Sequence, residues 1–390
     1  MIWPYIIISY FSLFVFGLTD NLRGPLFPEI LNTFEISDSF GSWMFAISSI
    51  SGFAASYVAR HLLRRFDRKS VLQGGCLSMI FGLLGLAWSP QFNIFLGFSF
   101  LLGLSLGIIG LIPNVLVSLG APPHLKQRLL SGLHAMYGLA SFCAPLVVAQ
   151  VGAITGSWRP VFLVAIAGPL SLLLYSLHST HHNLHEKPER KPEQPSLRKS
   201  HPLIPQLFIA CMLSFDVAGE IMISSRLALF MRREWNFDLQ QSSLYVTYFF
   251  IAMLVGRALF AIVHFRSSIR TLLSTSIVLT LAAGFAGLYI HPLFLALTGF
   301  TIAPFYPLSI AFFSSEFPED LDSAVSYMMA MDSLMLVFMH LVVGRMTDLW
   351  GIHQAILIGM GFFACSFIFL NSYNHVFRKK NSPTTGIRPS

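Results

Sequence analysis

The stretch LLGLSLGIIGLIPNVLVSLG, residues 101–120, decides the fold class of this chain. It runs for 20 residues without an acidic or basic side chain. A helix of about 18 or more such residues is long enough to cross the hydrocarbon core of a bilayer, whereas a helix on the surface of a soluble protein keeps one polar face. The stretch therefore predicts a membrane-spanning helix.

Composition places the whole chain in the same class. Of its 390 residues, 54% are hydrophobic and only 11% are charged, whereas about 25% of residues are charged in an average soluble domain. Apolar runs long enough to span a membrane follow one another from end to end, with short polar breaks between them. We predict an all-α polytopic membrane protein of the plasma membrane, which would be the inner membrane in a Gram-negative bacterium.

Twelve apolar runs can be distinguished, six on each side of one long polar stretch. We expect helices at residues 4–27, 41–62, 70–89, 92–118, 129–153, 158–177, 203–231, 242–264, 271–290, 292–315, 323–346 and 353–373. The first run lacks a preceding basic segment and a small-residue cleavage site, so we expect a retained helix rather than a signal peptide. The predicted units are a six-helix bundle at 1–177, a linker at 178–202, a second bundle at 203–373 and a tail at 374–390.

The lysines and arginines predict the orientation in the membrane. If alternate loops lie on alternate sides, most basic residues fall on one side, together with both termini, the linker and the tail. The positive-inside rule makes that side cytoplasmic. The acidic loop at 316–322 would lie on the same side, but it weakens the predicted orientation only slightly, because acidic residues contribute little to the rule. Orientation therefore accounts for the net charge of +7, and we expect no nucleic-acid partner.

Two pairs of segments predict an internal repeat. VGAITGSW at 151–158 and VGRMTDLW at 343–350 share the pattern V-G-x-x-T-x-x-W, each following the fifth helix of its set. Gly52 and Gly256 match in the same way, since each lies near the inner end of the second helix of its set, ahead of an arginine-bearing loop. Internal repeats of this kind are typical of secondary transporters.

Several motifs resemble the major facilitator superfamily over essentially the whole chain. They are the six-plus-six pattern, the basic linker, the W-R pair that opens the sixth helix, and the charged loop ARHLLRRFDRKS after the second helix. That loop keeps Asp67 and Arg68 of the superfamily signature G-x-x-x-D-R-x-G-R-R but loses its spaced glycines. We expect gating or structural roles for Asp67, Arg68, Gly256 and Arg257.

Two helices resemble the fucose permease branch of that superfamily. LLGLSLGIIGLIPNVLVSLGAPP at 101–123 is similar to its glycine-rich fourth helix, which carries an N-x-x-V motif. GLTDNLRGPLFPEILNTFEISDS at 17–39 is similar to its first helix, in which a proline follows an acid. Gly110 replaces the glutamate that those permeases carry four residues before the asparagine. The resemblance implies a sugar-like substrate.

Ionisable residues inside the predicted helices are candidates for the functional site, because each costs about 2.5–3.5 kcal/mol at the bilayer centre on insertion scales. Asp20 and Arg23 share one helix face, where they form either a structural ion pair or, with Asn21, part of a substrate site. Asp216 and Glu220 also share a face, and two neighbouring acids titrate as a unit. We expect the proton first on this acid pair and otherwise on Asp20.

These acids also have plain structural alternatives. Either member of the pair on the seventh helix could instead form an ion pair with Arg257 or Arg23. Asp332, the lone acid of the eleventh helix, could carry a proton, face a cavity or pair with Arg257. The sequence leaves these alternatives open.

Four further residues are candidates for substrate binding. Asn114 follows Pro113, where the missing proline N–H could open the helix locally. His134 lies among small residues and could equally form a hydrogen bond between helices. Trp43 and Tyr306 could stack on a sugar ring, although aromatic side chains also serve packing.

Motifs for other activities are missing from the sequence. It contains no phosphate-binding loop, no H-E-x-x-H helix and no G-x-S-x-G elbow, so we expect neither an enzyme nor a cofactor. The linker histidines 178, 181, 182 and 185 would align in a helix, but the prolines and charges around them favour a solvated linker without a metal.

The sequence as a whole predicts a secondary active transporter that works by alternating access. We expect proton symport of a small polar solute, sugar-like as a first choice, by a monomer in contact with membrane lipid. Two alternatives stay open: proton-driven export of an amphipathic compound, and a receptor on the same scaffold that does not transport. The acids inside the membrane argue against the receptor, because a static scaffold gains nothing from their insertion cost.

Overall fold

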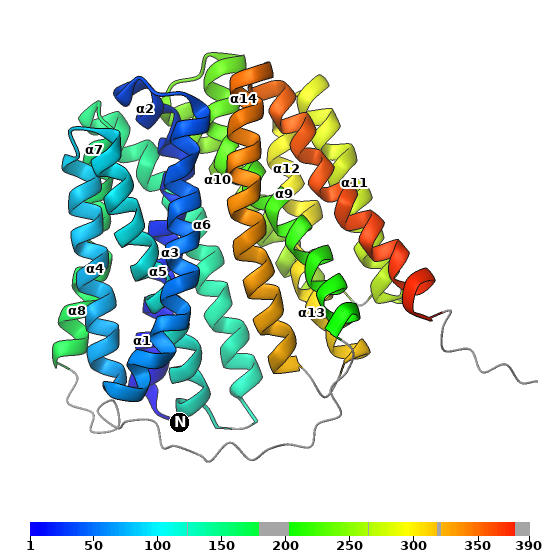
Figure 1. The fold of residues 1–390 in the computed structure, drawn as a ribbon, viewed down its shortest axis with the longest axis horizontal. Helices are drawn as coiled ribbons and strands as arrows, with labels where there is room; N and C mark the ends of the chain where they lie inside the picture. The colour runs from blue at the N-terminus through cyan, green and yellow to red at the C-terminus, as the bar shows by residue number, and fades with distance from the viewer. Residues whose placement is uncertain (123, 179–202, 264, 318–320, 379–390) are drawn as a thin grey trace, which may run out of the picture.

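The structure is a computed structural model that describes residues 1–122, 124–178, 203–263, 265–317 and 321–378 (Figure 1). Within these ranges the chain forms helices and no β-strand. The first half contains α1 (Trp3–Asn21), α2 (Arg23–Phe34), α3 (Asp38–Arg65), α4 (Arg68–Trp88), α5 (Phe92–Gly120), α6 (Lys126–Thr155), α7 (Arg159–Ala165) and α8 (Ala167–His178). The second half contains α9 (Leu203–Trp235), α10 (Leu239–Ile262), α11 (Ile269–Tyr289), α12 (Leu293–Ile302), α13 (Phe305–Glu316), α14 (Leu321–Tyr373) and η2 (Asn374–Arg378).

Ten helices of the described residues are long and apolar enough to cross a membrane. Three of these candidate spans are pairs of shorter helices that follow each other directly: α1 with α2, α7 with α8, and α12 with α13. α14 holds two helices that meet at Gly351, whose φ of 82° and ψ of 166° are not helical. α3 has 28 residues but is not among the ten. The predicted all-helical class is confirmed.

The first predicted helix, 4–27, ends too early, because the helical path continues through α2 to Phe34. Leu22 at the junction of α1 and α2 keeps helical angles, φ −64° and ψ −33°. Pro25 breaks the hydrogen-bond ladder of α1, since it has no N–H, but proline is tolerated in the first turn of the helix that follows. Glu35 then ends α2 with a left-handed φ of 50°.

The second predicted helix, 41–62, is also too short, because α3 begins at Asp38 and runs to Arg65. Its start is set by Ser37, whose side-chain oxygen accepts a hydrogen bond from the backbone N–H of Phe40 at 3.2 Å. This is an N-cap, which supplies a partner to one of the free N–H groups of the first turn. Caps of this kind lie outside the apolar pattern that predicted the helix.

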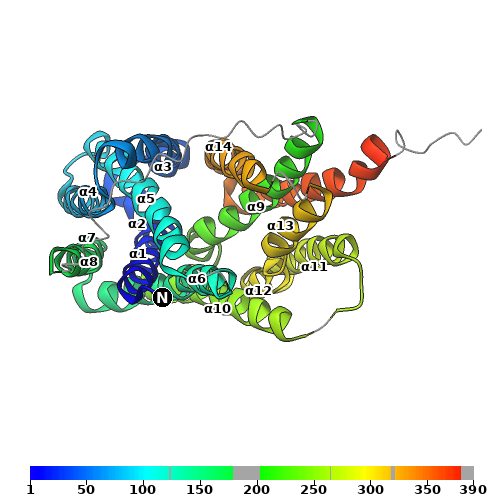
Figure 2. The same cartoon turned by 90° about the horizontal axis from the view of Figure 1, so that it is seen from below.

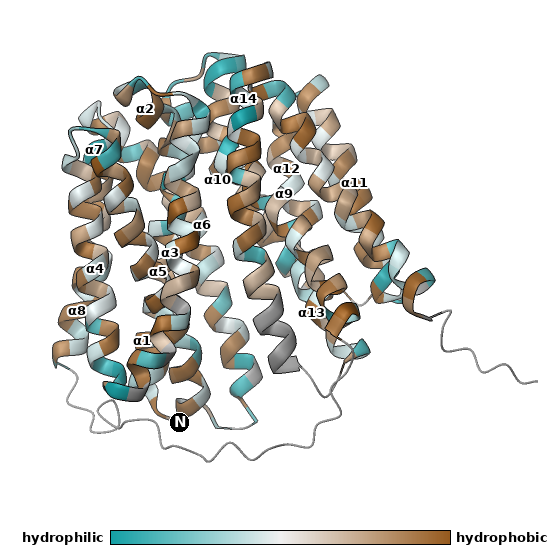
Figure 3. Cartoon of the chain, viewed as in Figure 1, coloured by the Kyte–Doolittle hydropathy of each residue, from teal (hydrophilic) through white to brown (hydrophobic). Residues whose placement is uncertain are grey.

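The two halves of the chain lie side by side. Seen along the helices, α1 and α3–α8 gather on one side, α9 and α11–α14 gather on the other, and α10 lies beside α6 (Figure 2). The N-terminus and the start of α9 lie at one end of the molecule, here called the near end, and α2 lies at the opposite, far end (Figure 1). Hydrophobic residues dominate outer helices such as α11 (Figure 3).

The halves touch most extensively through three helix pairs, α2 with α9, α3 with α14, and α6 with α10, and also through α2 with α10. Two glycines allow close approach. A Cβ atom at Gly24 of α2 would lie 3.1 Å from the Cα of Ser225 on α9. A Cβ atom at Gly344 of α14 would lie 2.9 Å from the carbonyl oxygen of Asp38 on α3. Small residues at such crossings let the helix backbones pack directly.

The two V-G-x-x-T-x-x-W segments share one side-chain contact but differ in where the helix ends, since α6 ends at Thr155 whereas α14 is helical through Trp350. The hydroxyls of Thr155 and Thr347 each donate to the carbonyl four residues earlier, both at 2.7 Å. Each segment is followed or interrupted by a glycine with positive φ, 65° at Gly156 and 82° at Gly351, which reverses the chain direction where few other residues fit. The two glycines stand at different places in the pattern, so the internal repeat stays a prediction.

The predicted linker and tail lie largely outside the described residues. Of the linker, only His178 is described, at the end of α8, so the alignment of its histidines cannot be followed. Of the tail, η2 is described and residues 379–390 are not. Among the described residues, no group of three or more His, Cys, Asp or Glu side chains is placed to hold a metal ion.

Candidate functional site

A polar network joins the end of α1 to α6. Tyr137 donates to Oδ2 of Asp20 at 3.3 Å, and the amide of Asn21 donates to the hydroxyls of Ser141 at 3.0 Å and Tyr137 at 3.3 Å. Arg23 forms an ion pair with Asp20. The predicted pairing of Asp20 with Arg23 therefore occurs, and it anchors the acid in the first half.

A small pocket lies between the two halves beside this network. Asn21, Tyr137 and Ser141 line it from the first half, and Glu220 and Arg257 line it from the second. Apolar side chains of α9 and α10 complete its wall. Arg257 attracts the carboxyl group of Glu220 electrostatically. Both side chains are described, and they are not close enough to form a direct ion pair. The pocket thus brings polar groups of both halves together.

The other predicted acids of the second half gather near Glu220. Asp216 lies one turn earlier on α9, is only 2% exposed, and its Oδ1 has no hydrogen-bond partner among the described residues. Asp332 of α14 accepts a hydrogen bond from the hydroxyl of Ser214 at 2.6 Å, so that hydroxyl is its partner in this structure. Tyr306 interacts electrostatically with both Asp332 and Glu220. The structure therefore groups three acids and one tyrosine.

Of the predicted substrate residues, Asn21 lines this pocket, and the other six do not: Asp20, Arg23, Trp43, Asn114, His134 and Tyr306. Trp43 is 39% exposed. The amide of Asn114 donates to the carbonyl of Gly110 in its own helix at 3.0 Å, and α5 continues through Pro113 without the expected opening. His134 makes no hydrogen bond within the described part of the chain, but it interacts electrostatically with Arg257.

The residues expected to serve gating or structure have clear structural contacts. Asp67 caps α4 by accepting from the backbone N–H of Ser70 at 3.2 Å, and Arg68 is buried. A Cβ atom at Gly256 would lie 2.7 Å from the carbonyl oxygen of a residue on α12, and one at Gly52 would lie 3.2 Å from a carbonyl on α5. Both glycines thus permit close helix crossings at corresponding places in the two halves.

A set of polar contacts joins the halves at the far end, and none of its residues was predicted from the sequence to lie in a site. Asp348 of α14 accepts hydrogen bonds from the backbone N–H groups of Asp38 at 2.8 Å and Ser39 at 3.0 Å, at the start of α3. Arg233 of α9 pairs with Asp38 at 2.8 Å. These contacts, together with the ion pair of Arg232 with Glu29, are here called the far-end contacts. A carboxylate at a helix N-terminus is favourable, because the free N–H groups and the helix dipole both attract it.

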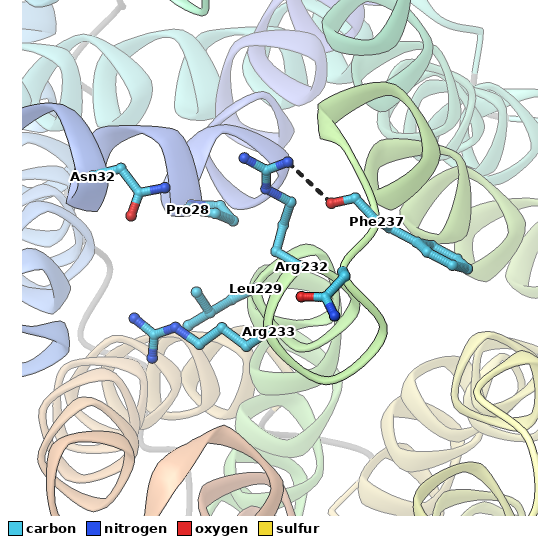
Figure 4. Close-up of a pocket in the computed structure, with 7 residues that line it drawn as sticks. Pro28, Asn32, Leu229, Arg232, Arg233 and Phe237 are labelled. Atoms are coloured by element: carbon cyan, nitrogen blue, oxygen red, sulfur yellow. Dashed lines mark hydrogen bonds between the residues drawn. The ribbon is translucent and has the colours of Figure 1, made fainter.

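A second ion pair accompanies a surface pocket at the same end. Arg232 pairs with Glu29 across α9 and α2 and donates to the carbonyl oxygen of Phe237 at 3.0 Å (Figure 4). The pocket lies between these helices, with Pro28 and Asn32 on one side and α9 and the segment after it on the other. Both of its arginines are therefore held by acids of the first half.

Comparison with known proteins identifies the family. The model of the Major Facilitator Superfamily matches residues 9–321 and 209–387. The chain belongs to this superfamily of transporters, and with its ten apolar helices it is an integral membrane protein. The family and the structural neighbours are transporters, which points to a protein that is not an enzyme.

The curated relatives match part of their own length. An uncharacterized MFS-type transporter of Bacillus subtilis (strain 168), YfiU, is 27% identical over 169 residues, which are 43% of this chain and 32% of that protein. The chain spans about a third of the length of the curated relatives it matches.

Solved structures match almost the whole fold. A D-xylose-proton symporter has a TM-score of 0.77 at 15% identity and covers 97% of each chain. The major facilitator transporter FucP, in the outward conformation, has a TM-score of 0.62 at 16% identity over 95% of this chain and 99% of its own. At these identities the likeness concerns the fold.

Proposed function

We propose that this chain is a secondary active transporter that moves a small polar solute by alternating access, with the proton as coupling ion. The observation that carries the proposal is the pocket between the halves, which Asn21 and Tyr137 line from one side and Glu220 and Arg257 from the other. Alternating access requires a site that both halves share, so that their relative movement can open it to either side.

The proposed topology has twelve crossings in two six-helix bundles. It counts α3 as the second crossing and divides α14 at Gly351 into the eleventh and the twelfth. The positive-inside rule then puts both termini, and with them the near end, in the cytoplasm. The far-end contacts in this orientation hold the protein closed toward the outside.

We place the proton on the two acids of α9. Glu220 lines the pocket, and Asp216 lies buried one turn away with an oxygen that no described residue bonds. A buried carboxylate without a partner is costly, and a bound proton removes its charge. Asp20 is less suited to release and rebind a proton, because Arg23 and Tyr137 already hold its carboxylate. We give Asp20 and Asn21 a role in substrate binding or gating.

The substrate proposal is a polar, hydroxyl-bearing solute. The pocket offers an amide, two hydroxyls, an acid and an arginine, which suit multiple hydrogen bonds better than an apolar compound. The resemblance of two helices to fucose permeases favours a sugar-like molecule, and a proton symporter of D-xylose shares the fold.

The test is transport into proteoliposomes that contain the purified chain. An inward proton gradient is imposed, and labelled sugars, sugar acids, nucleosides and amino acids are offered one at a time. We expect uptake against a gradient for at least one polar solute, abolished by a protonophore. Proton-driven extrusion would show an exporter instead, and no flux with any solute would contradict transport altogether.

A further inference from the structure

Three basic side chains from both halves surround one aromatic ring on the far side of the pocket. The ring is Phe45 of α3, and His340 of α14 stacks on it at 4.6 Å between ring centroids. The guanidinium carbons of Arg226 and Arg23 lie 5.2 Å and 5.6 Å from the same centroid. Arg23, Arg226 and His340 are here called the basic cluster. All three are at most 6% exposed.

The hydrogen-bonding capacity of the basic cluster is largely unused. Nε and Nη1 of Arg226, Nη1 of Arg23 and Nδ1 of His340 have no hydrogen-bond partner among the described residues. With the described residues, Arg226 makes one hydrogen bond, from Nη2 to the hydroxyl of Ser42 at 2.8 Å. Buried charged donors without acceptors are costly, so a site that retains several of them is suited to an acceptor that arrives from outside.

The acids nearby do not neutralise Arg226. Asp20 is paired with Arg23, and Asp38 is paired with Arg233. Asp38 also attracts the guanidinium of Arg226 electrostatically, whereas the positive charge of Arg233 repels that guanidinium. Asp348 lies against the backbone of Asp38 and adds a negative charge to this region. The positive charge of Arg226 nevertheless has no direct ion-pair partner among the described residues.

Aromatic packing compensates part of this charge. The guanidinium carbon of Arg226 lies 4.2 Å from the ring centroid of Phe27, on α2. A cation over an aromatic face is stabilised electrostatically, but the ring accepts none of the directional hydrogen bonds that the guanidinium offers. The rings of Phe27 and Phe45 therefore hold the guanidinium of Arg226 in place and leave its N–H donors available.

The cluster lies between the pocket and the far-end contacts. Arg226 follows Glu220 by six residues and precedes Arg232 by six. At the rise of an α-helix, six residues correspond to about 9 Å along α9 in each direction. The cluster therefore lies farther along α9 toward the far end than the pocket does.

We propose that Arg226, Arg23 and His340 bind an acidic group, a carboxylate or a phosphate, of the transported solute. The planar donors of arginine match two oxygens of either group, and the imidazole adds a third donor or an acceptor for a bound hydroxyl. The inference rests on the proposed transport function and refines its substrate class from a polar solute to an acidic one. Opening of the far end admits the anion, and closure around it supplies the missing acceptor.

Binding to the cluster is tested with purified full-length chain in detergent. D-glucuronate, D-glucose 6-phosphate and D-glucose are added as probes, with sodium chloride at equal ionic strength as the reference. We expect a saturable rise in thermal stability with at least one acidic probe and none with glucose, because a ligand stabilises the state that binds it. The first two probes distinguish a carboxylate from a phosphate. Equal stabilisation by glucose, or none by either acid, overturns the proposal.

Variants connect the binding to the cluster. Arg226→Gln should raise the Kd of the acidic probe by about tenfold or more, because it removes a charge-assisted hydrogen bond. Arg226→Lys keeps the charge but loses the paired donors, and we expect an intermediate Kd. Arg345→Gln is the matched control, since it removes one exposed positive charge from α14. A Kd unchanged by Arg226→Gln, in a monodisperse sample, overturns the assignment, and Arg23→Gln serves where that variant does not fold.

Flux measurements separate this inference from the proposed function. If the acidic probe binds through Arg226 but no solute is transported into proteoliposomes, the cluster stands and the transport proposal is wrong. If only neutral solutes are transported with protons, the transport proposal stands and the anion site is wrong.

Discussion

The pocket and the basic cluster lie six residues apart on α9, at Glu220 and Arg226, yet their charges are compensated in opposite ways. Near the pocket an acid, Asp216, lacks a partner for Oδ1, whereas in the cluster the unpartnered groups are arginine nitrogens. A carboxylate can lose its charge by taking up a proton, but an arginine stays charged under all physiological conditions. The region around the pocket therefore suits a proton, and the basic cluster suits an anion.

Removing the acid of the pocket should have the largest effect on function. We expect Glu220→Gln to abolish uphill accumulation while solute exchange continues, because the amide can still hydrogen-bond a solute but cannot exchange a proton. Uptake driven by a proton gradient, compared with exchange between equal solute concentrations, measures this in proteoliposomes. Glu234→Gln, an exposed acid near the end of the same helix, is the control. Normal accumulation by Glu220→Gln would show that the coupling site lies elsewhere.

Bulk at the crossing of α2 and α9 should prevent closure of the far end. Gly24→Leu would place side-chain atoms against the backbone of Ser225, and overpacking of this kind costs about 1–3 kcal/mol in the closed state. Spin labels on cysteines at the exposed positions 35 and 236 should then move apart. Gly74→Leu is the control, since a Cβ there meets no atom within 4 Å. Unchanged label distances in Gly24→Leu would argue against closure at this crossing.

Loss of the acid that caps α3 should loosen the same end less. Asp348→Ala removes the acceptor of two backbone N–H groups, and loss of an N-cap costs about 0.5–2 kcal/mol. We expect a partial shift toward the longer label distance, with Glu234→Ala as the exposed control. A shift as large as that of Gly24→Leu would mean that polar contacts, rather than backbone packing, dominate closure.

The smallest effect is expected for the ion pair of Glu29 with Arg232. The side chain of Glu29 is 22% exposed and that of Arg232 is 26% exposed. Partly exposed ion pairs contribute about 0.2–1 kcal/mol to stability. A double-mutant cycle with Glu29→Gln and Arg232→Gln, read out as the fraction of closed molecules, measures the coupling. It should shrink at high salt because mobile ions screen the pair. A coupling that does not change with salt would indicate a better buried contact than the structure shows.

Much of the secondary structure could be predicted because its cause is local. Hydrophobic length alone located the helices, and the errors concern ends, such as that of α2, where caps and prolines rather than apolar residues decide. The proximity of Asp216 to Glu220 also followed from helical spacing. The contact of Asp348 with Asp38 could not, since the partners are 310 positions apart and neither stands out in its own segment.

The sequence by itself determined the membrane class, the helical segments and the shared face of the acids on α9. These depend on the transfer of each segment into lipid and on the pitch of a single helix, which a linear pattern contains. Only the tertiary structure decided that Asp20 is held by Arg23 and Tyr137 and that Arg226 is left with unused donors beside Phe45. Which charges meet depends on how the two halves pack, and that packing is set by crossings such as Gly24 with Ser225.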